Sequence, residues 1–484
     1  MSCFFFLFSD GKVYLEKSNL KTNCTKKALE EFPNDVFDLE TRRRGAIVLH
    51  CFLAFYMFVL LNFVCDDYFV PSIKTLCERL SISKDVAGAT FMAAATSSPE
   101  LFINIIGTFV TKGDLGVGTI VGSAVFNILA VPACCGLLGG QSVKIDWWPL
   151  TRDCFVYGLT VVLLIIFLNN GYIAWNEALI LVILYFFYIT AMYHNDSISN
   201  YVKNFWRKRI NGRRPYREIK ITQESIPLLK YKKVYYGREE QDVGSFVQVN
   251  ETYSSLFKNE GGMDSESNEN CGETIFVIPE GLASKFFFFF SFPISFVLYV
   301  TIPDCKRKNK QRLWPITFIM CIVWIAGTSY VVSWMITVVG DTLSIPDSVM
   351  GLTFLAAGMS IPEATSSVIV TNQGHGGMGI SSSIGSNTFD ILLCLGLPWL
   401  IKSTFFPAQS GNHLIKINSR GLGYTAISLL TTLTFLYASF FFNRFILDRK
   451  IGILCLFMYL TFLIFACLME LNVFFIVNLP PCGS

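Results

Sequence analysis

The residues from Gly88 to Glu100 read GATFMAAATSSPE, and those from Gly351 to Glu363 read GLTFLAAGMSIPE. Eight of these thirteen positions are identical. A second stretch from Gly122 to Leu129, GSAVFNIL, is matched in the same way by GSNTFDIL from Gly385 to Leu392. Both pairs lie 263 positions apart. Two matches at one offset indicate an internal duplication of the chain.

The composition places this duplication in a membrane. Of the 484 residues, 52% are hydrophobic and 45 are Phe, whereas only 15% are charged. An ordinary soluble domain has about 25% charged residues. The composition therefore excludes a soluble enzyme, a disordered chain and a nucleic-acid binder, and the net charge of +3 is too small to indicate an anionic partner. The fold class we expect is an all-α polytopic membrane protein.

Predicted spans follow from the apolar stretches, since a bilayer core needs about 20 apolar residues per helix. Ten stretches qualify: 45–70, 86–109, 117–138, 150–168, 172–192, 314–339, 346–371, 380–401, 422–442 and 451–477. An eleventh candidate, 286–302, is short and contains Pro293. The basic cluster at 306–312 would face outward if this segment crossed, against the rule that basic residues stay in the cytoplasm. We therefore expect an interfacial or re-entrant segment, with a plain short span as the alternative.

The predicted organisation has six parts. They are an outside (extracellular or lumenal) N-terminal segment 1–44, a first membrane half 45–192 with repeat 86–138, a mostly flexible cytoplasmic loop 193–285, the segment 286–313, a second membrane half 314–477 with repeat 346–401, and a tail 478–484. Basic residues at 203–238 favour the cytoplasmic side and contact with anionic lipid, although the arginines at 42–44 argue for the opposite orientation. Five spans on each side of the loop give the two repeats opposite directions, which is typical of secondary transporters.

Carboxylates inside the repeats carry the functional prediction. Glu100 and Glu363 lie in apolar spans at equivalent positions, and Asp390 adds a third acid. A charge at the bilayer centre costs at least ~2.5 kcal/mol, so such residues face a cavity and have a partner. The repeat motifs contain no Lys or Arg. We therefore expect bound cations to neutralise the acids near the midplane.

Further oxygens lie around these acids. Pro99 and Pro362 are expected to free the carbonyls of Ala95 and Gly358, because proline removes a helical hydrogen bond. Side-chain oxygens nearby belong to Thr96, Ser97, Ser123, Asn127, Ser360, Ser366 and Ser386. An oxygen set without His or Cys favours Na⁺, K⁺ or Ca²⁺ over zinc or copper. By contrast, we expect Asp66 and Asp67, near the end of the first predicted span, at the membrane interface.

At these residues the sequence resembles the potassium-dependent sodium/calcium exchangers, solute carrier family 24 of the cation/calcium exchanger superfamily. The resemblance is carried by 85–94, 116–129, 360–363 and 384–391, and it covers nearly the whole chain outside the loop. The runs 298–305 and 340–347 look closest to member 5 of that family. The resemblance implies the sodium/calcium exchanger fold, with two inverted five-helix repeats, in the plasma membrane or a Golgi-derived endomembrane.

The same resemblance implies a ligand set. Glu100 and Glu363 would be the shared Ca²⁺/Na⁺ carboxylates, and Asp390 would mark the potassium-dependent branch. The shell would be completed by Thr96, Ser97, Ser123, Asn127, Ser360, Ser386 and the backbone carbonyls of Ala93 and Ala356. The chain departs from the family pattern at four positions: Ala95 for Gly, Met359 for Thr, Glu363 for Asp and Asn104 for Ser.

The predicted function is an antiport of Ca²⁺, with K⁺, against Na⁺ by alternating access. This function needs no cofactor and no covalent chemistry, so the chain is not expected to be an enzyme. Two alternatives remain open at this point. One is a Ca²⁺/H⁺ exchanger in which Glu100 and Glu363 take up protons, and the other is a transport-inactive homologue that acts as a membrane scaffold.

Overall fold

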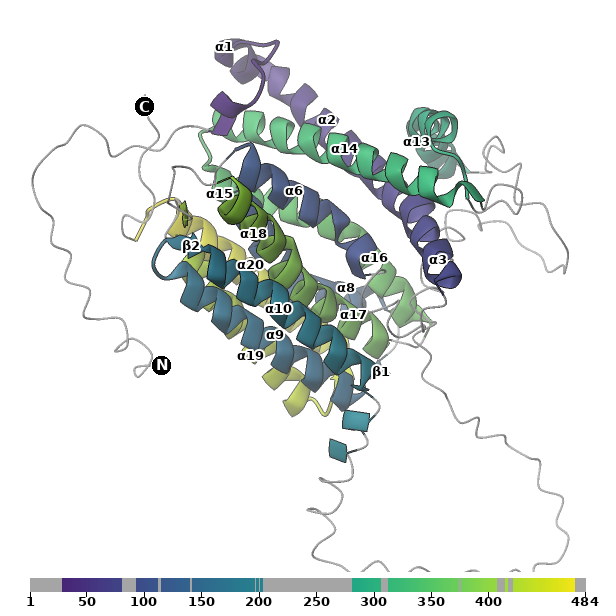
Figure 1. The fold of residues 1–484 in the computed structure, drawn as a ribbon, viewed down its shortest axis with the longest axis vertical. Coiled ribbons are helices and arrows are strands. Elements are labelled where there is room, and N and C mark those ends of the chain that lie inside the picture. The colour runs from purple at the N-terminus through teal and green to yellow at the C-terminus, as the bar shows by residue number, and fades with distance from the viewer. Residues whose placement is uncertain are drawn as a thin grey trace, which may run out of the picture.

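The computed structural model describes residues 28–80, 93–111, 115–139, 142–195, 197–199, 201–202, 281–305, 312–373, 376–406, 414–416 and 421–474. These residues form a bundle of helices (Figure 1). Within them, nine helices are long and apolar enough to cross a membrane. Nine of the ten predicted spans are thus confirmed. The tenth, 86–109, lies partly outside the described residues, as do the loop 203–280 and most of the basic cluster 306–312.

The first half begins with a short 3-10 turn, η2 (Ala28–Glu31). Its helical segments are α1 (Leu39–Thr41), η3 (Arg42–Ala46), α2 (Ile47–Phe63), η4 (Val64–Phe69), α3 (Val70–Arg79), α5 (Ala93–Thr96), α6 (Ser98–Phe109), α7 (Leu115–Val125), η6 (Phe126–Ala130), α8 (Val131–Leu138), α9 (Trp147–Leu168) and α10 (Trp175–Tyr193). The first span is longer than predicted, since its helical segments extend from Leu39 to Arg79, with a kink at Gly45 (φ 132°) inside η3 and a π-helical turn at η4.

The second half repeats this order. Its segments are α13 (Leu282–Thr301), α14 (Trp314–Leu343), α15 (Asp347–Met350), η9 (Gly351–Leu355), α16 (Ala356–Asn372), α17 (Gly376–Phe389), η10 (Asp390–Leu395), α18 (Gly396–Phe405), α19 (Gly421–Phe442) and α20 (Arg449–Glu470). The last helix ends at Glu470, before the predicted end at 477.

Helix packing shows that the two halves are equivalent in space. The hairpin of α6 and α7 in the first half corresponds to the hairpin of α16 and α17 in the second. Helix α20 packs on α8, and in the same way α10 packs on α18, while α2 pairs with its own counterpart α14 and α9 with α19. Each half therefore completes its packing on the other half.

Two small antiparallel sheets show that the repeat is inverted. Strand β1 (Val143–Lys144) pairs with β4 (Ile446–Leu447), and β2 (Tyr172–Ala174) pairs with β3 (Leu414–Lys416). The labels β1 and β2 lie at opposite ends of the bundle (Figure 1). Strand β1, in the loop before α9, pairs with β4 in the loop after α19, whereas β2, in the loop after α9, pairs with β3 in the loop before α19. Because α9 and α19 are counterparts, the two-fold rotation that relates the halves exchanges the two sheets. This relation holds only if the halves run in opposite directions through the membrane, as predicted.

Close contacts between helices depend on glycine. A Cβ atom added to Gly122 would lie 2.3 Å from the carbonyl oxygen of Leu352, and one added to Gly351 would lie 2.6 Å from that of Leu115. Helix α7 thus packs backbone against backbone on η9, as small residues permit in membrane helices.

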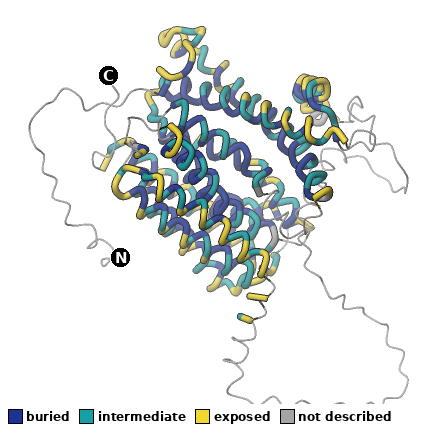
Figure 2. The backbone as a smooth tube through the Cα atoms, viewed as in Figure 1, coloured by how far each residue is buried: buried dark blue, intermediate teal, exposed yellow. Residues whose placement is uncertain are grey.

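Burial separates an interior from a lipid-facing surface (Figure 2). Buried residues follow the inner faces of the helices, whereas the outer faces of α9, α10 and α20 expose large apolar side chains such as Phe155, Phe186 and Phe457. A surface of this kind suits hydrocarbon and not water. The eleven described cysteines are all free thiols, and eight of them are buried, as expected for small apolar residues.

Candidate cation site

The first repeat breaks its helix at the predicted site. Helix α5 ends at Thr96, Ser97 is non-helical with φ −91° and ψ 14°, and α6 restarts with Pro99 in its first turn. Proline is tolerated there because that N–H has no helical partner in any case. Glu100 follows in the same first turn. In the second repeat, α16 continues through Pro362 without interruption.

One expectation about these prolines is wrong. The carbonyl of Ala95 was predicted to be free, but it accepts a hydrogen bond of 2.9 Å from the hydroxyl of Ser98. The helix break allows this local bond, since a serine hydroxyl readily bonds to a carbonyl three residues back.

The three predicted carboxylates come together between the halves. Glu100 is 2% exposed and Asp390 is 1% exposed. Asp390 and Glu363 both lie close enough to Glu100 to interact with it electrostatically. The side chain of Glu363, in the second repeat, faces Asn127 of the first repeat. The described ion pairs of the chain do not include any of these acids. Three acids close together in a low-dielectric interior require bound cations or protons.

The predicted hydroxyls divide into two groups. The Ser97 and Ser360 hydroxyls are buried and have no hydrogen-bond partner. The Ser123 hydroxyl donates instead to the carbonyl of Ile120, and the Ser386 hydroxyl donates to that of Ser383, each at 3.1 Å. In both helices the hydroxyl bonds to the backbone three residues back, which is the usual alternative to ligation.

Asn387 is a residue that the sequence analysis missed. Its Oδ1 accepts a 3.1 Å hydrogen bond from Asn127, and its Nδ2 lies 3.5 Å from the carbonyl oxygen of Ala124. Ala124 is the residue 263 positions before Asn387, so this contact lies where the two repeats meet on their two-fold axis. The signal was present, because Asn387 is a polar residue inside the duplicated motif opposite an alanine.

Two π-helical segments position the third acid and its counterpart. Asn127 lies in η6 and Asp390 begins η10, at equivalent repeat positions. A π-helical turn displaces side chains from the regular helical register and is frequent at functional sites. The thiol of Cys394, one turn further in η10, contacts both Asp390 Oδ1 at 3.8 Å and the Ser97 carbonyl at 3.7 Å.

The unpartnered atoms fit an alkali or alkaline-earth cation. Five buried side-chain oxygens in this region lack a hydrogen-bond partner: Ser97 Oγ, Glu100 Oε2, Asn127 Oδ1, Ser360 Oγ and Glu363 Oε2. Among the described residues, no group of three His, Cys, Asp or Glu side chains could hold a metal by itself. Any ion here is therefore held by carboxylates together with hydroxyl, amide and carbonyl oxygens, which suits hard cations. Of the two predicted backbone ligands, Ala356 is buried at the start of α16 and Ala93 begins α5.

A cavity of about 100 Å³ leads to this cluster. Its walls come from α2 and η4, from Thr96 and Pro99 at the helix break, and from α16 and α17. Along α16 it extends from Gly358 to Val370, and along α17 from Ser386 to Gly379. The cavity therefore runs from Glu363 toward the end of the bundle where α16 turns into α17.

Asp66 is one of the residues that line the cavity. The helix continues to Arg79, so Asp66 lies thirteen residues, or about 20 Å, before its end.

The equivalent space on the other side of the acids is filled. Positions in the first repeat that correspond to cavity-lining Ser366 and Ser383 are Ile103 and Ile120, and both are buried. Asn104, which corresponds to Ser367, lies against Gly116 and donates to the carbonyl of Cys394. Among the described residues, the cavity thus reaches Glu363 from the end of the bundle where α16 turns into α17, whereas buried isoleucines and Asn104 occupy the equivalent positions of the first repeat.

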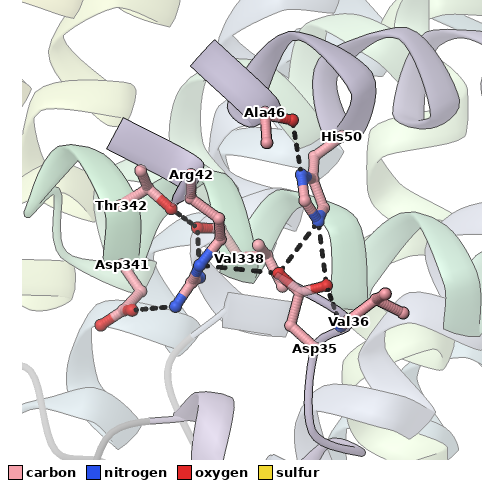
Figure 3. A network of polar contacts seen from close by, with 8 residues as sticks. All are labelled: Asp35, Val36, Arg42, Ala46, His50, Val338, Asp341 and Thr342. Atoms are coloured by element: carbon pink, nitrogen blue, oxygen red, sulfur yellow. Dashed lines mark hydrogen bonds and ion pairs between the residues drawn. The ribbon is translucent and has the colours of Figure 1, made fainter. Parts of the chain in front are cut away.

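A network of charged side chains lies at the N-terminal end of the first span, the end away from Asp66 (Figure 3). Arg42 lies between Asp35, 3.5 Å away, and Asp341 of α14, 3.3 Å away. His50 contacts Asp35 at 3.1 Å and the carbonyl of Ala46 at 3.1 Å. Arg42 is therefore buried within the protein and joins the start of the first span to the end of α14.

Packing explains one departure from the family pattern. A Cβ atom on Gly358 would lie 2.5 Å from the ring of Phe58. Ala95, the counterpart of Gly358, instead belongs to a cluster with Cys321, which is the counterpart of Phe58. The smaller partner in one half makes room for the methyl group of Ala95. Met359, the counterpart of Thr96, is buried against Ile103 and Leu355 beside the cavity.

The inverted repeats, the broken helix and the acids gathered beside a cavity define a class of protein, a polytopic membrane protein of the secondary-transporter type. The chain belongs to the sodium/calcium exchanger protein family, whose model matches residues 50–194 and 313–468.

Relatives cover nearly all of the chain. It is 38% identical to sodium/potassium/calcium exchanger 4 of Mus musculus, over 96% of this chain and 88% of that protein. It is also 38% identical to exchanger 3 of Rattus norvegicus (96% and 89%) and 37% identical to exchanger 5 of Homo sapiens (96% and 91%). The resemblance to the potassium-dependent exchangers is thereby confirmed. A solved structure of the sodium-calcium exchanger NCX_Mj, soaked with zero Na⁺ and Ca²⁺, aligns with a TM-score of 0.42 at 18% identity, covering 86% of this chain and 98% of that chain.

Proposed function

We propose that this protein is a secondary antiporter that moves Ca²⁺, together with K⁺, in exchange for Na⁺ by alternating access. The observation that carries the proposal is the meeting of Glu100, Glu363 and Asp390 between inverted halves, where Glu100 and Asp390 are buried. Five side-chain oxygens there lack a hydrogen-bond partner, two of them belonging to Glu100 and Glu363. The relatives named as sodium/potassium/calcium exchangers support the same choice of ions.

The ions are the substrates of this exchange. Glu100 and Glu363 neutralise either one Ca²⁺ or the Na⁺ ions that replace it, with Ser97, Ser360 and Asn127 as further oxygen ligands. Thr96 and the carbonyls of Ala93 and Ala356 complete the shell. Ser123 and Ser386 would have to give up their hydrogen bonds to backbone carbonyls before their hydroxyls could coordinate an ion. Asp390 supplies the extra charge that K⁺ balances. The acids cannot be exposed to both sides at once, which is the requirement for coupled exchange.

Orientation and membrane belong to the proposal as well. The long loop 193–285 lies in the cytoplasm, the N-terminal segment lies outside, and the cavity consequently opens to the cytoplasm. The membrane is the plasma membrane or a Golgi-derived endomembrane. Ions and lipid are the proposed partners, with anionic lipid at 203–238.

The test is Na⁺-gradient-driven uptake of ⁴⁵Ca²⁺ into proteoliposomes at fixed pH, with and without K⁺. We expect uptake that needs both the Na⁺ gradient and K⁺. Uptake driven by a pH gradient in the absence of Na⁺ would instead identify a Ca²⁺/H⁺ exchanger. Absence of uptake under both gradients, from protein that is correctly folded by size-exclusion chromatography, would identify a transport-inactive homologue.

A further inference from the structure

Asp66 lies on one face of the first span together with two other residues that line the cavity. Phe58, Asn62 and Asp66 are spaced four apart and therefore share a face of the helix. The neighbouring Asp67 lies in the same π-helical segment η4 and is not among the residues that line the cavity. The two adjacent acids thus differ in their access to the space that leads to Glu363.

The opposite wall of the cavity carries hydroxyl groups. Ser366 and Ser367 come from α16, and Ser382 and Ser383 come from α17. Of the described residues that line the cavity, Asp66 and Glu363 are charged and none is Lys, Arg or His. At the inner end, Glu363 Oε2 is buried without a hydrogen-bond partner. A cation entering this space meets two carboxylates and a row of serine hydroxyls set into walls that are otherwise largely apolar.

The positions that the internal duplication relates to these residues lack this arrangement. Ser329 is the counterpart of Asp66, so the negative charge is absent there. Ser329 is fully buried, as are Ile103 and Ile120, the counterparts of Ser366 and Ser383. Within the described residues, a cavity that carries this negative charge is consequently present on one side of the membrane only.

We propose that Asp66 recruits cations into the cavity and sets the apparent ion affinity on the side of the membrane where α16 turns into α17. This inference rests on the proposed antiport, whose substrates are Ca²⁺ and Na⁺. A fixed negative charge in a cavity with low-dielectric walls raises the local concentration of cations and their rate of entry. Asp66 lies on the access path, whereas Glu100, Glu363 and Asp390 hold the ion at the end of it.

The first test measures transport from each side separately, in inside-out and right-side-out vesicles. Asp66→Asn is expected to raise the half-saturating Ca²⁺ concentration on the cavity side by about three- to tenfold and to leave the other side unchanged. The effect should diminish at high ionic strength. Asp67→Asn is the matched control and should change neither side. Equal changes on both sides, no change, or the same change in the control would overturn the inference.

A second test does not depend on transport. In purified protein carrying Ser382→Cys, the labelling rates of this thiol by a cationic and an anionic methanethiosulfonate are compared by mass spectrometry. The ratio of cationic to anionic rates should fall about three- to tenfold when Asp66→Asn is added, and should not change with Asp67→Asn. An unchanged ratio would contradict the role of Asp66. Absence of Na⁺-driven Ca²⁺ flux in the parent protein would refute the antiport, but the labelling ratio would still decide whether Asp66 attracts cations.

Discussion

Glu100 and Glu363 occupy equivalent positions but different local structures. Glu100 lies in the first turn of a new helix after the break at Ser97, whereas Glu363 lies within the continuous helix α16 and borders the cavity. The duplicated motif thus supplies two carboxylates with unequal access. Neither acid is part of a described ion pair, and under the proposed function each relies on bound cations for its charge to be tolerated.

Replacement of Glu100 by Gln tests this dependence. Glu100→Gln should abolish Na⁺-driven ⁴⁵Ca²⁺ exchange, since the amide cannot neutralise Ca²⁺, while the neutral side chain is easier to bury. Calcium should raise the melting temperature of the parent but not that of the variant, because only the parent binds it. Glu40→Gln, at an exposed position, is the control. Near-normal exchange in Glu100→Gln would refute the assigned role.

Asp390 is the residue on which potassium dependence should rest. Its counterpart is Asn127, so the two halves differ by one negative charge at this position. Asp390→Asn removes the charge that K⁺ balances, and we expect Ca²⁺ transport that hardly responds to K⁺. The measurement is a K⁺ titration of Na⁺-driven Ca²⁺ flux in parent and variant. Identical responses would assign potassium dependence to other residues.

The candidate site was predictable from sequence to the extent that it is duplicated. Glu100, Glu363 and Asp390 follow from the repeat and from the cost of burying a charge, and the structure brings them together. Ser123 and Ser386 could not be distinguished from Ser97 and Ser360, because a hydroxyl's choice between its own backbone and an ion depends on the helix geometry. The duplicated motif shows that Asn387 is polar, but its hydrogen bond to Asn127 forms only when the two repeats pack together, so the sequence does not reveal the partner.

At the scale of helices, Gly358 and Phe58 show how tightly the first span packs on α16. Gly358→Ala should place a methyl group against the Phe58 ring and lower the stability by about 1–3 kcal/mol, the usual cost of overpacking. Adding Phe58→Cys, which copies the pairing of Ala95 with Cys321, should recover part of this loss. Thermal unfolding in detergent provides the comparison. A double variant less stable than Gly358→Ala alone would contradict the packing argument.

Arg42 fastens the beginning of the first span to α14. Arg42→Met should destabilise the protein by about 3–5 kcal/mol, because Asp35 and Asp341 would lose a buried positive partner. Arg44→Met removes an exposed pair with Glu40 and should cost less than about 1 kcal/mol. Chemical denaturation of both variants in the same detergent measures the difference. Equal stabilities would show that the network does not hold these helices together.

Helix positions were predicted well because apolar length is visible in the sequence, but helix ends were not. The first span was predicted to end at 70, but its helix continues to Arg79, so Asp66 and Asp67 lie well before the helix ends. These acids are tolerated because Asp66 faces a cavity, and a cavity is a property of packed helices. The two small sheets were missed since each strand has two or three residues, too few for an alternating pattern.

For the molecule as a whole, topology depends on α13. In Figure 1 this helix is seen end-on, whereas α2 and α14 are seen lengthwise. Its Phe290 ring packs 5.2 Å from that of Tyr56, and Trp324 donates a 3.1 Å hydrogen bond to Thr301. The helix thus lies across the first spans of both halves. This arrangement supports the prediction that it does not cross the membrane.

A single cysteine tests this topology. Asn309→Cys, in a background without other reactive thiols, should be labelled by an impermeant maleimide only after the membrane is permeabilised, because the basic cluster that follows α13 is expected in the cytoplasm. A cysteine in the N-terminal segment, at Thr25, is the control and should be labelled in intact cells. Labelling of the Asn309→Cys protein in intact cells would show that α13 crosses.

The exchange of strands between the halves also bears on how the protein is made. When the ribosome has completed the first half, β1 and β2 have no partners, since β4 and β3 belong to sequence not yet synthesised. The same is true of α8 and α10, whose packing partners are α20 and α18. The first half must therefore remain in the bilayer with packing surfaces that lack their partners, and the final structure forms only after the last helix has been inserted. Maturation is then a single late event for the entire chain, and a truncated product would lack a finished fold for the cell's quality control to accept.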